Sequence, residues 1–198
     1  MKKRPSEVQG LDERVRRSKT TVLDTTSELL YERGLSGTSV DEISRRSGVA
    51  KTTIYRHWPT RVALLRDACS QIRGTPFDTP DTGSLEGDVV ALLTQLAHLL
   101  RSDKSASVLP SVIDAAERDP DVAEMYRTLQ AGYSAPLESV IRKAVTKREL
   151  PRSIDVALLV SALTGPLFFR RWFSREPLTA KFAEQIAQLV LHGRRNAR

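Results

Sequence analysis

Apolar residues recur every three or four positions along almost the whole chain. In the segment from Asp12 to Arg33 these positions are Val15, Val22, Leu23, Thr26, Leu29 and Leu30. Such spacing places them on one face of a helix, whereas a half-buried strand would alternate apolar and polar residues. No segment shows that alternation, so the sequence predicts an all-α protein.

Glycines and prolines divide this helical pattern into segments. Two short helices follow Arg33, and further helices are expected at residues 60–72, 84–101, 105–118, 120–148, 153–174 and 178–193. Residues 74–83 hold two prolines and two glycines, so we place a domain boundary there, between residues 1–74 and 75–198. Pro136 and Gly165–Pro166 lie inside expected helices and predict kinks. The polar, basic residues 1–11, which include Pro5 and Gly10, predict a flexible arm.

The first short helix is predicted from Val40 to Ser47. Ser39 and Glu42 have the spacing of a capping box, in which each side chain binds the backbone amide of the other residue. Gly48 follows where the chain must take a positive φ, which glycine does at little cost.

The second short helix is predicted from about Lys51 to Trp58, because Pro59 pushes the residue before it out of the α conformation. The apolar residues of the pair can face one small core: Ile43, Val49, Ile54 and Trp58. The other faces of the second helix carry polar, cationic and aromatic side chains and no acid: Lys51, Thr52, Thr53, Tyr55, Arg56 and His57. A helix of about two turns, held from behind and presenting such groups, fits the major groove of DNA.

This stretch resembles the helix-turn-helix signature of the TetR family of bacterial repressors. The positions that carry the resemblance are Gly34, Ser39, Ile43, Gly48–Val49, Tyr55, His57, Trp58 and Arg61. Ser44 and Ser47 depart from the alanines that are usual there, and their hydroxyls can bond back to a carbonyl. More loosely, Pro110 to Gly193 resembles the C-terminal domain of a TetR subgroup, at Arg118-Asp119-Pro120, Arg148-Glu149-Leu150-Pro151, Asp155, Gly165-Pro166-Leu167-Phe168-Phe169 and Pro177-Leu178.

The resemblance implies an N-terminal three-helix DNA-binding domain and a C-terminal helical domain that binds a ligand and dimerises. It also implies a repressor that binds a palindromic operator as a homodimer and is released by a small apolar or amphipathic molecule. We assign Thr52, Thr53 and His57 to base edges or the groove, Ser39, Lys51, Tyr55 and Arg61 to phosphates, and Arg56 to either.

Basic residues before this motif have two open interpretations. Lys2, Lys3 and Arg4 can reach a neighbouring groove, or they can form a solvated tail. Arg14, Arg16, Arg17 and Lys19 can contact phosphates, or they can form a charged solvated face. Residues 1–73 hold 15 Lys and Arg against 9 Asp and Glu, a net charge of +6, whereas residues 74–198 hold 16 against 15. Nearly all of the excess charge therefore lies with the helix-turn-helix, where a DNA-binding surface needs it.

Apolar residues of the middle helices can line one shared ligand cavity with few polar groups. The candidates are Leu92, Leu96, Leu109, Val112, Met125, Tyr126, Leu129, Tyr133, Phe168 and Trp172, with Gln95, His98 and Asp114 as candidate polar contacts. The alternative for each residue is ordinary core packing.

The expected helix at 153–174 is apolar on nearly every side until Arg170, so one internal core cannot cover it. The helix at 178–193 adds a second apolar stripe. Two such helices from each chain would form a four-helix dimer interface, as the resemblance implies, with Val156, Leu159, Leu163, Leu167, Phe182, Ile186, Leu189 and Val190. A dimer also supplies two half-sites, because one short recognition helix reads only a few base pairs.

Other features of the sequence argue against an enzyme, a metal site or a cofactor. His57, His98 and His192 are far apart, and neither a glycine-rich phosphate loop nor a nucleophile motif is found. The single cysteine, Cys69, excludes an intrachain disulfide and suits a reducing cytosol. We expect a cytoplasmic regulator that does not use a membrane. The longest uncharged apolar stretch, Val156–Phe169, is shorter than the roughly 20 residues of a membrane span, and no signal peptide follows Met1.

The competing functional hypothesis is an adaptor that keeps the helix-turn-helix but answers to a partner protein instead of a small ligand. Salt-dependent binding to DNA from the protein's own promoter region separates the two hypotheses.

Overall fold

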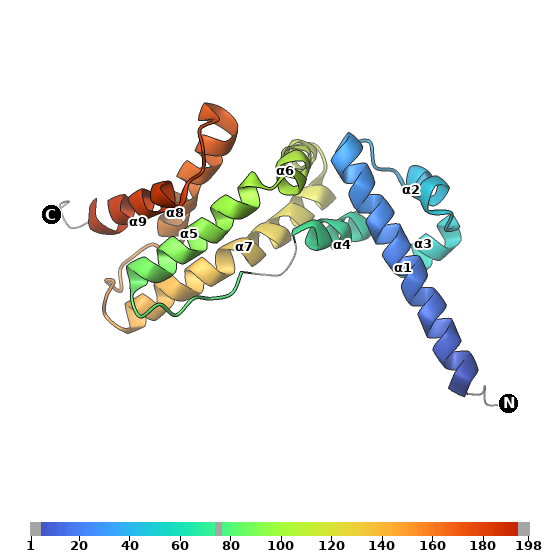
Figure 1. Cartoon of the computed structure of the whole chain (residues 1–198), viewed down its shortest axis with the longest axis horizontal. Helices are drawn as coiled ribbons and strands as arrows, with labels where there is room; N and C mark the ends of the chain where they lie inside the picture. The colour runs from blue at the N-terminus through green and yellow to red at the C-terminus, as the bar shows by residue number, and fades with distance from the viewer. Residues whose placement is uncertain (1–4, 74–76, 194–198) are drawn as a thin grey trace. The chain divides into compact units, whose positions relative to one another are not determined.

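The computed structural model describes residues 5–73 and 77–193, and within them the side chains of residues 13–72, 77–103 and 107–193. The helices of this part of the chain are α1 (Pro5–Arg33), α2 (Val40–Ser47), α3 (Lys51–His57), α4 (Arg61–Arg73), α5 (Leu85–Arg101), α6 (Asp103–Ala116), α7 (Pro120–Thr146), α8 (Val156–Phe169), the π-helical turn η1 (Arg170–Ser174) and α9 (Ala180–Gly193). No strand occurs among the residues described, which confirms the all-α prediction (Figure 1).

The chain forms two compact units. The first contains residues 1–74 together with 107–127, and the second contains 75–106 together with 128–198. Most of α6 and the first turns of α7 therefore group with the helix-turn-helix, although the sequence pattern assigned them to the C-terminal domain.

Helix α1 begins at Pro5, so the flexible arm predicted for residues 1–11 is wrong from residue 5 onward. Proline is well tolerated in the first turn of a helix, and one glycine such as Gly10 weakens a helix without ending it. Lys2, Lys3 and Arg4 lie outside the described residues. Val15, which the pattern assigned to the inward face, is 39% exposed.

The first unit is built on α1, which packs against α2, α3 and α4 (Figure 1). Thr60 caps α4, since the amide of Ala63 donates to the Thr60 hydroxyl at 3.1 Å. Helix α6 starts at Asp103, so Pro110 lies well inside the helix.

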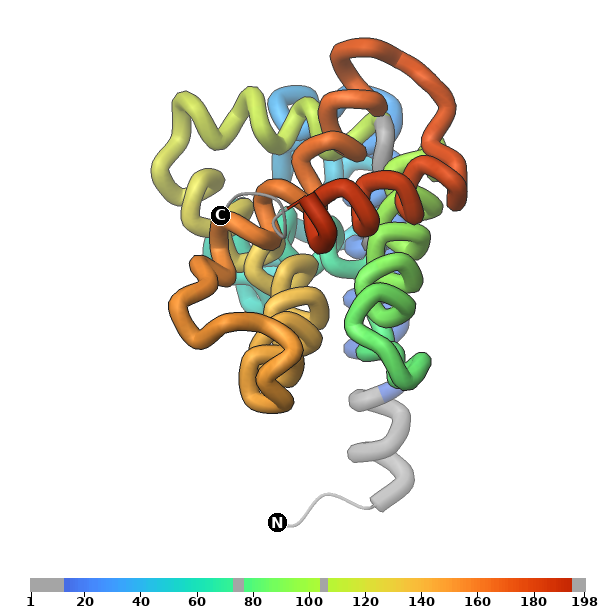
Figure 2. The backbone as a smooth tube through the Cα atoms, turned by 90° about the vertical axis from the view of Figure 1, so that its left-hand side faces the viewer, coloured from blue at the N-terminus to red at the C-terminus, as the bar shows by residue number. Residues whose placement is uncertain are grey.

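In the second unit α5 packs against α8 and α9, and α8 packs against α9 (Figure 2). Asp155 caps α8 by accepting a hydrogen bond from the amide of Leu158 at 3.0 Å. Arg171, in the π-helical turn, donates from Nε to the carbonyl of Leu100 at the end of α5 at 2.8 Å. This bond satisfies one of the carbonyls that a helix end leaves without a partner.

Helix α8 continues through η1 to Ser174, where the sequence predicted the helix to end, and so extends beyond the uncharged stretch Val156–Phe169. Val156–Ser174 spans 19 residues with a mean hydropathy of 1.2, so by length and composition alone it could cross a membrane. Only 17% of that segment is buried within the chain, and Leu158, Phe169 and Phe173 are 66%, 59% and 77% exposed. Contiguous exposed apolar side chains of this kind are typical of an interaction surface.

Candidate nucleic-acid interface

The entry to α2 has the geometry expected of a helix N-cap. Ser39 is extended, with φ −101° and ψ 155°, and its hydroxyl accepts a hydrogen bond from the amide of Glu42 at 3.2 Å. Gly48 ends the helix with φ 69°, the positive value predicted from the sequence. Glu42 does not complete a capping box, because its carboxylate binds arginines instead.

Two serines fix the turn between α2 and α3. The Ser44 hydroxyl donates to the carbonyl of Val49 at 2.8 Å, and the amide of Val49 donates to the Ser47 hydroxyl at 3.2 Å. Both backbone groups of Val49 are therefore paired by side chains of α2. The two serines that depart from the family's usual alanines add hydrogen bonds to this turn.

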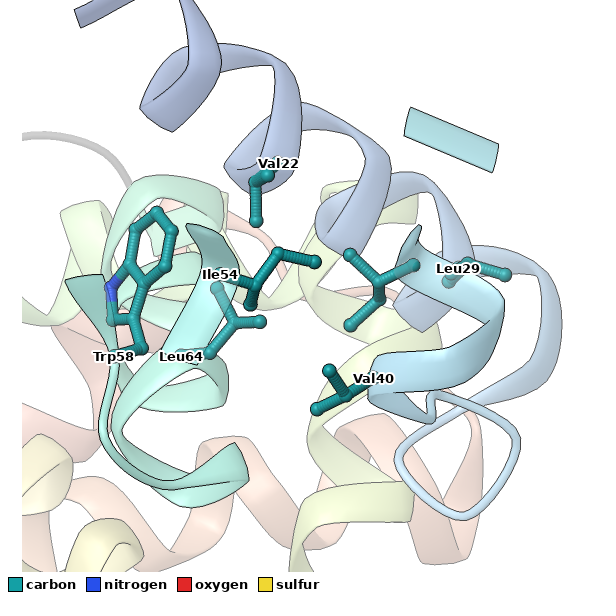
Figure 3. Packing of buried hydrophobic residues seen from close by; sticks show 7 residues of the cluster. Val22, Leu29, Val40, Ile54, Trp58 and Leu64 are labelled. Atoms are coloured by element: carbon teal, nitrogen blue, oxygen red, sulfur yellow. The ribbon is translucent and has the colours of Figure 1, made fainter. Parts of the chain in front are cut away.

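One apolar cluster supports α3 from behind (Figure 3). Its buried members come from all four of the first helices and from the residue after α3: Val22, Leu29, Val40, Ile43, Ile54, Trp58 and Leu64. Ile54 and Trp58 are 1% and 5% exposed. The indole N–H of Trp58 donates to Asp67 on α4 at 2.9 Å, which fixes the ring that ends the recognition helix.

The remaining side chains of α3 face outward or sideways. Lys51, Thr52, Tyr55 and Arg56 are exposed, whereas Thr53 and His57 are half-buried. Lys51 forms an ion pair with Asp41 on α2. The helix thus presents two hydroxyls, a phenol, cationic groups and an imidazole, and its apolar face is fixed in the core. Such side chains can bond to base edges and to phosphates.

The surroundings of His57 favour its neutral form. Burial lowers its pKa below the usual 6.5, and the neighbouring positive charges of Lys19 and Arg56 lower it further. A neutral imidazole carries one donor and one acceptor, so it can discriminate base edges without adding a fixed charge.

Arginines of α1 and α2 gather around one carboxylate. Glu42 accepts from Arg45 at 2.7 Å and from Arg46 at 3.1 Å, and Arg33 lies 3.5 Å away. Arg46 also forms a two-bond pair with Glu32 on α1, at 2.7 and 2.9 Å. The spacing of Glu42 from Arg45 and Arg46 is a local signal for the pairs within α2. No local pattern indicated the Arg46–Glu32 pair, which ties α2 to α1.

Arg61, predicted to contact a phosphate, is hydrogen-bonded within the chain. Its Nε donates to the carbonyl of Thr38 at 2.9 Å, and its Nη2 donates to the carbonyl of Leu35 at 2.5 Å. Arg61 lies in the first turn of α4, where a cation is unfavourable next to the helix dipole. Two carbonyl dipoles offset that cost, so a phosphate is not required to explain the residue.

Two family models match the chain. One, described as bacterial regulatory proteins of the tetR family, matches residues 22–68. The other, the Tetracyclin repressor-like C-terminal domain, matches residues 79–190, which is more than half of the chain. The chain belongs to the TetR family. TetR proteins are DNA-binding transcriptional regulators and not enzymes, so both expectations are confirmed.

Relatives of this TetR protein cover it almost fully. The uncharacterized HTH-type transcriptional regulator YdeS of Bacillus subtilis (strain 168) is 28% identical over 179 residues, which are 87% of each chain. The solved TetR family transcription regulator SCO0332 is 30% identical, with a TM-score of 0.67 over 89% of this chain and 97% of that one. FadR from Bacillus subtilis, solved in complex with stearoyl-CoA, has a TM-score of 0.67 at 15% identity over 88% and 98% of the two chains, and shares the fold.

The residues predicted to line a ligand cavity are divided between the two units. Leu109, Val112, Asp114, Met125 and Tyr126 belong to the first unit, and the other eight belong to the second. His98 and Asp114 are exposed, and Asp114 forms an ion pair with Arg118. In the second unit Phe168 stacks on Trp172 with ring centroids 5.7 Å apart. The cavity itself stays a prediction.

Four of the eight residues predicted at the dimer interface are buried within the chain. Leu159, Leu163, Leu167 and Ile186 are 5%, 0%, 0% and 7% exposed. Val156, Phe182 and Val190 are half-buried, and Leu189 is 68% exposed. The buried leucines face inward, so another face of α8 must serve any interface.

Proposed function

We propose that this TetR protein is a repressor that binds a palindromic DNA operator as a homodimer and is released by a small apolar or amphipathic ligand. The observation that carries the DNA-binding part is the surface of α3. Six polar or cationic side chains, from Lys51 to His57, surround a helix that Ile54 anchors in a closed apolar core. The net charge of +6 on residues 1–73 supplies the attraction to phosphates that binding requires.

The direct test uses the full-length protein and two fluorescently labelled duplexes of equal length. One carries the DNA upstream of the protein's own gene, and the other has a mixed sequence. We expect tighter binding to the upstream DNA and a linear decrease of log K with log salt concentration. Binding that ignores salt, or equal binding to both duplexes, would favour the adaptor hypothesis.

The proposed dimer uses the outward face of α8. Its exposed residues combine small side chains in the middle with large apolar ones toward the ends: Leu158, Ser161, Ala162, Gly165, Phe169 and Phe173. A Cβ added at Gly165 would meet nothing within 4 Å, so a neighbouring backbone has room to approach there. Leu189 on α9 is exposed as well. We propose a second copy of the chain, not a lipid bilayer, as the cover of this face, because two half-sites on DNA require a dimer.

The ligand part of the proposal rests on the family and on the apolar residues of the middle helices. Family members are often ligand-responsive repressors. Stearoyl-CoA, the ligand of the FadR structure, is a reasonable first probe because it is amphipathic. A ligand present at about 100 times its Kd stabilises the folded protein by about 2.7 kcal/mol, which a thermal-shift assay detects. A true effector must also release the upstream duplex.

A further inference from the structure

The turn between α1 and α2, residues 34–38, is closed by its own last residue. The amide of Thr38 donates to the carbonyl of Leu35 at 3.2 Å, and the Thr38 hydroxyl donates to the carbonyl of Gly34 at 2.8 Å. Leu35 and Thr38 are 1% and 0% exposed. Thr38 is followed directly by Ser39, the N-cap of α2, so the geometry of this turn sets where α2 begins.

Ser111 on α6 holds the same turn from a second side. The amide of Leu35 donates to the Ser111 hydroxyl at 3.1 Å, and that hydroxyl donates to the carbonyl of Val108 at 2.8 Å. The hydroxyl thus acts as acceptor and donor at once. The approach is close, because a Cβ on Gly34 would lie 2.9 Å from the Cβ of Ser111.

Arg61 on α4 holds the turn from a third side. Its guanidinium reaches the carbonyls of Leu35 and Thr38 with two different nitrogens. A planar guanidinium can span two acceptors in fixed geometry, whereas the ammonium of a lysine acts as a single point. Leu35 is therefore bound through its amide to α6 and through its carbonyl to α4.

We propose that Ser111 and Arg61 are positioning residues that lock the 34–38 turn and thereby fix the orientation of α2 and α3 for DNA. In this assignment Arg61 supports DNA binding by fixing the 34–38 turn, and it does not contact a phosphate. The proposal rests on the DNA binding proposed above, but the lock itself is a property of the free protein.

The first arm of the test measures backbone amide exchange by NMR in the free, full-length protein. Arg61→Ala and Ser111→Ala should each accelerate exchange in residues 35–47. In Ser111→Ala the Leu35 amide should exchange about tenfold faster or more, since this buried donor loses its acceptor. Arg66→Ala and Ser70→Ala are the matched controls. They remove the same side-chain types from α4 away from the 34–38 turn, where the exposed Arg66 pairs with Asp67 and the half-buried Ser70 bonds within its helix.

The second arm measures binding to the upstream duplex as salt is varied. Arg61→Ala should weaken binding about tenfold and leave the salt slope unchanged, because no phosphate contact is lost. Arg61→Lys should behave like Arg61→Ala, since it keeps the charge and loses the two-carbonyl geometry. Ser111→Ala should weaken binding in the same way without any change of charge.

Three outcomes would overturn the proposal. One is a salt slope that falls by about one unit in Arg61→Ala, with full rescue by Arg61→Lys, which identifies a phosphate contact. Another is unchanged exchange at residues 35–47 in both variants. The third is an equal loss of binding in the control variants. If the wild-type protein binds no DNA, the proposed function fails, and the exchange arm still decides whether the lock exists.

Discussion

Glycines and hydroxyls determine the backbone geometry around the helix-turn-helix. Gly34 and Gly48 both have positive φ, at 64° and 69°, but their surroundings differ. Gly34 lies against Ser111, whereas Gly48 faces open space. In the turn between α2 and α3, the hydroxyls of Ser44 and Ser47 bond to the backbone of Val49, which follows Gly48.

This contrast predicts that Gly34→Ala destabilises the protein more than Gly48→Ala. Each substitution places an L-residue in the left-handed region, which costs roughly 1–2 kcal/mol. At residue 34 the new Cβ would also lie 2.9 Å from the Cβ of Ser111, and one of the two must move. Urea unfolding midpoints measure the difference. Gly48→Asn is the control: asparagine adopts the left-handed conformation readily, so this variant should lose less stability than Gly48→Ala. Equal unfolding midpoints for the two alanine variants would contradict the prediction.

The carboxylate of Glu42 predicts a pH dependence of stability. The hydrogen bond from Arg45, with further support from Arg46 and Arg33, outweighs burial and lowers the pKa of Glu42 from 4.5 to about 2. Because this folded-state pKa lies below the unfolded one, the carboxylate stabilises the fold above about pH 4.5, and that stabilisation is lost as the pH falls toward 2.

Thermal unfolding of Glu42→Gln and wild type across pH tests this directly. The variant should be less stable at neutral pH, and the two melting temperatures should converge between pH 4.5 and 2. A difference that stays constant over that window would mean that Glu42 does not act through its charge.

Among the helices, α3 and α8 differ in how well the sequence pattern predicts which side chains are buried. Helix α3 has one apolar face, so its inward residue Ile54 and the following Trp58 were predictable, and Pro59 predicted where the helix ends. Helix α8 is apolar all round, so its sequence could not tell which leucines face the chain's own core. Leu163 and Leu167 are inside and Leu158 is outside, and packing against α5 and α9 decides this.

Hydrogen bonds between residues far apart in sequence could not be predicted either, because they depend on how the helices pack. The pattern identified Ser39 as an N-cap and Gly48 as a helix end, because both signals are local. Arg61 was predicted to bind a phosphate from its charge and its place in the helix-turn-helix motif, whereas its two carbonyl partners are 23 and 26 residues away in sequence. Ser111 is 76 residues from Leu35, and no local pattern could pair them.

The proposed DNA-reading surface of α3 predicts that loss of the Thr53 hydroxyl affects sequence discrimination, whereas loss of a threonine hydroxyl on another helix does not. Thr53→Ala should lower the ratio of specific to mixed-sequence binding, because a lost contact to a base edge removes roughly 1–3 kcal/mol of discrimination. Thr146→Ala is the matched control, since that exposed hydroxyl on α7 bonds to the carbonyl of Arg142 in its own helix. Competition titrations with the two duplexes measure the ratio, and an equal effect of both variants would remove Thr53 from the reading surface.

At the scale of the whole molecule, the apolar face of α8 and η1 stays uncovered by the rest of the chain that the structure describes. Leu158, Phe169 and Phe173 are each more than half exposed, and Phe169 stacks on Phe173 with centroids 5.5 Å apart. A soluble monomer rarely leaves such a face to water. A second copy of the chain is the cover proposed above, and members of this family typically form homodimers.

This arrangement predicts different results for aspartate substitutions on the two faces of α8. Leu158→Asp should give a folded monomer, because the new charge lies on the outward face and opposes only the partner. Leu163→Asp should instead prevent folding, because residue 163 is fully buried and an unpaired charge there is strongly destabilising. Sedimentation and circular dichroism together distinguish the two results. A Leu158→Asp protein that remains a tight dimer would place the interface elsewhere.

The fit between Gly34 and Ser111 also limits how such regulators can be recombined. A hybrid that joins residues 1–74 to the ligand-binding half of another relative cuts the chain at its linker, yet it exchanges the residue that bonds to Leu35. A relative with a side chain at position 34 would place its Cβ against the Cβ of residue 111, and a residue without a hydroxyl at 111 would leave the Leu35 amide without its acceptor. Positions 34 and 111 must therefore be transplanted as a pair, so the unit of exchange for sensor engineering is not contiguous in sequence.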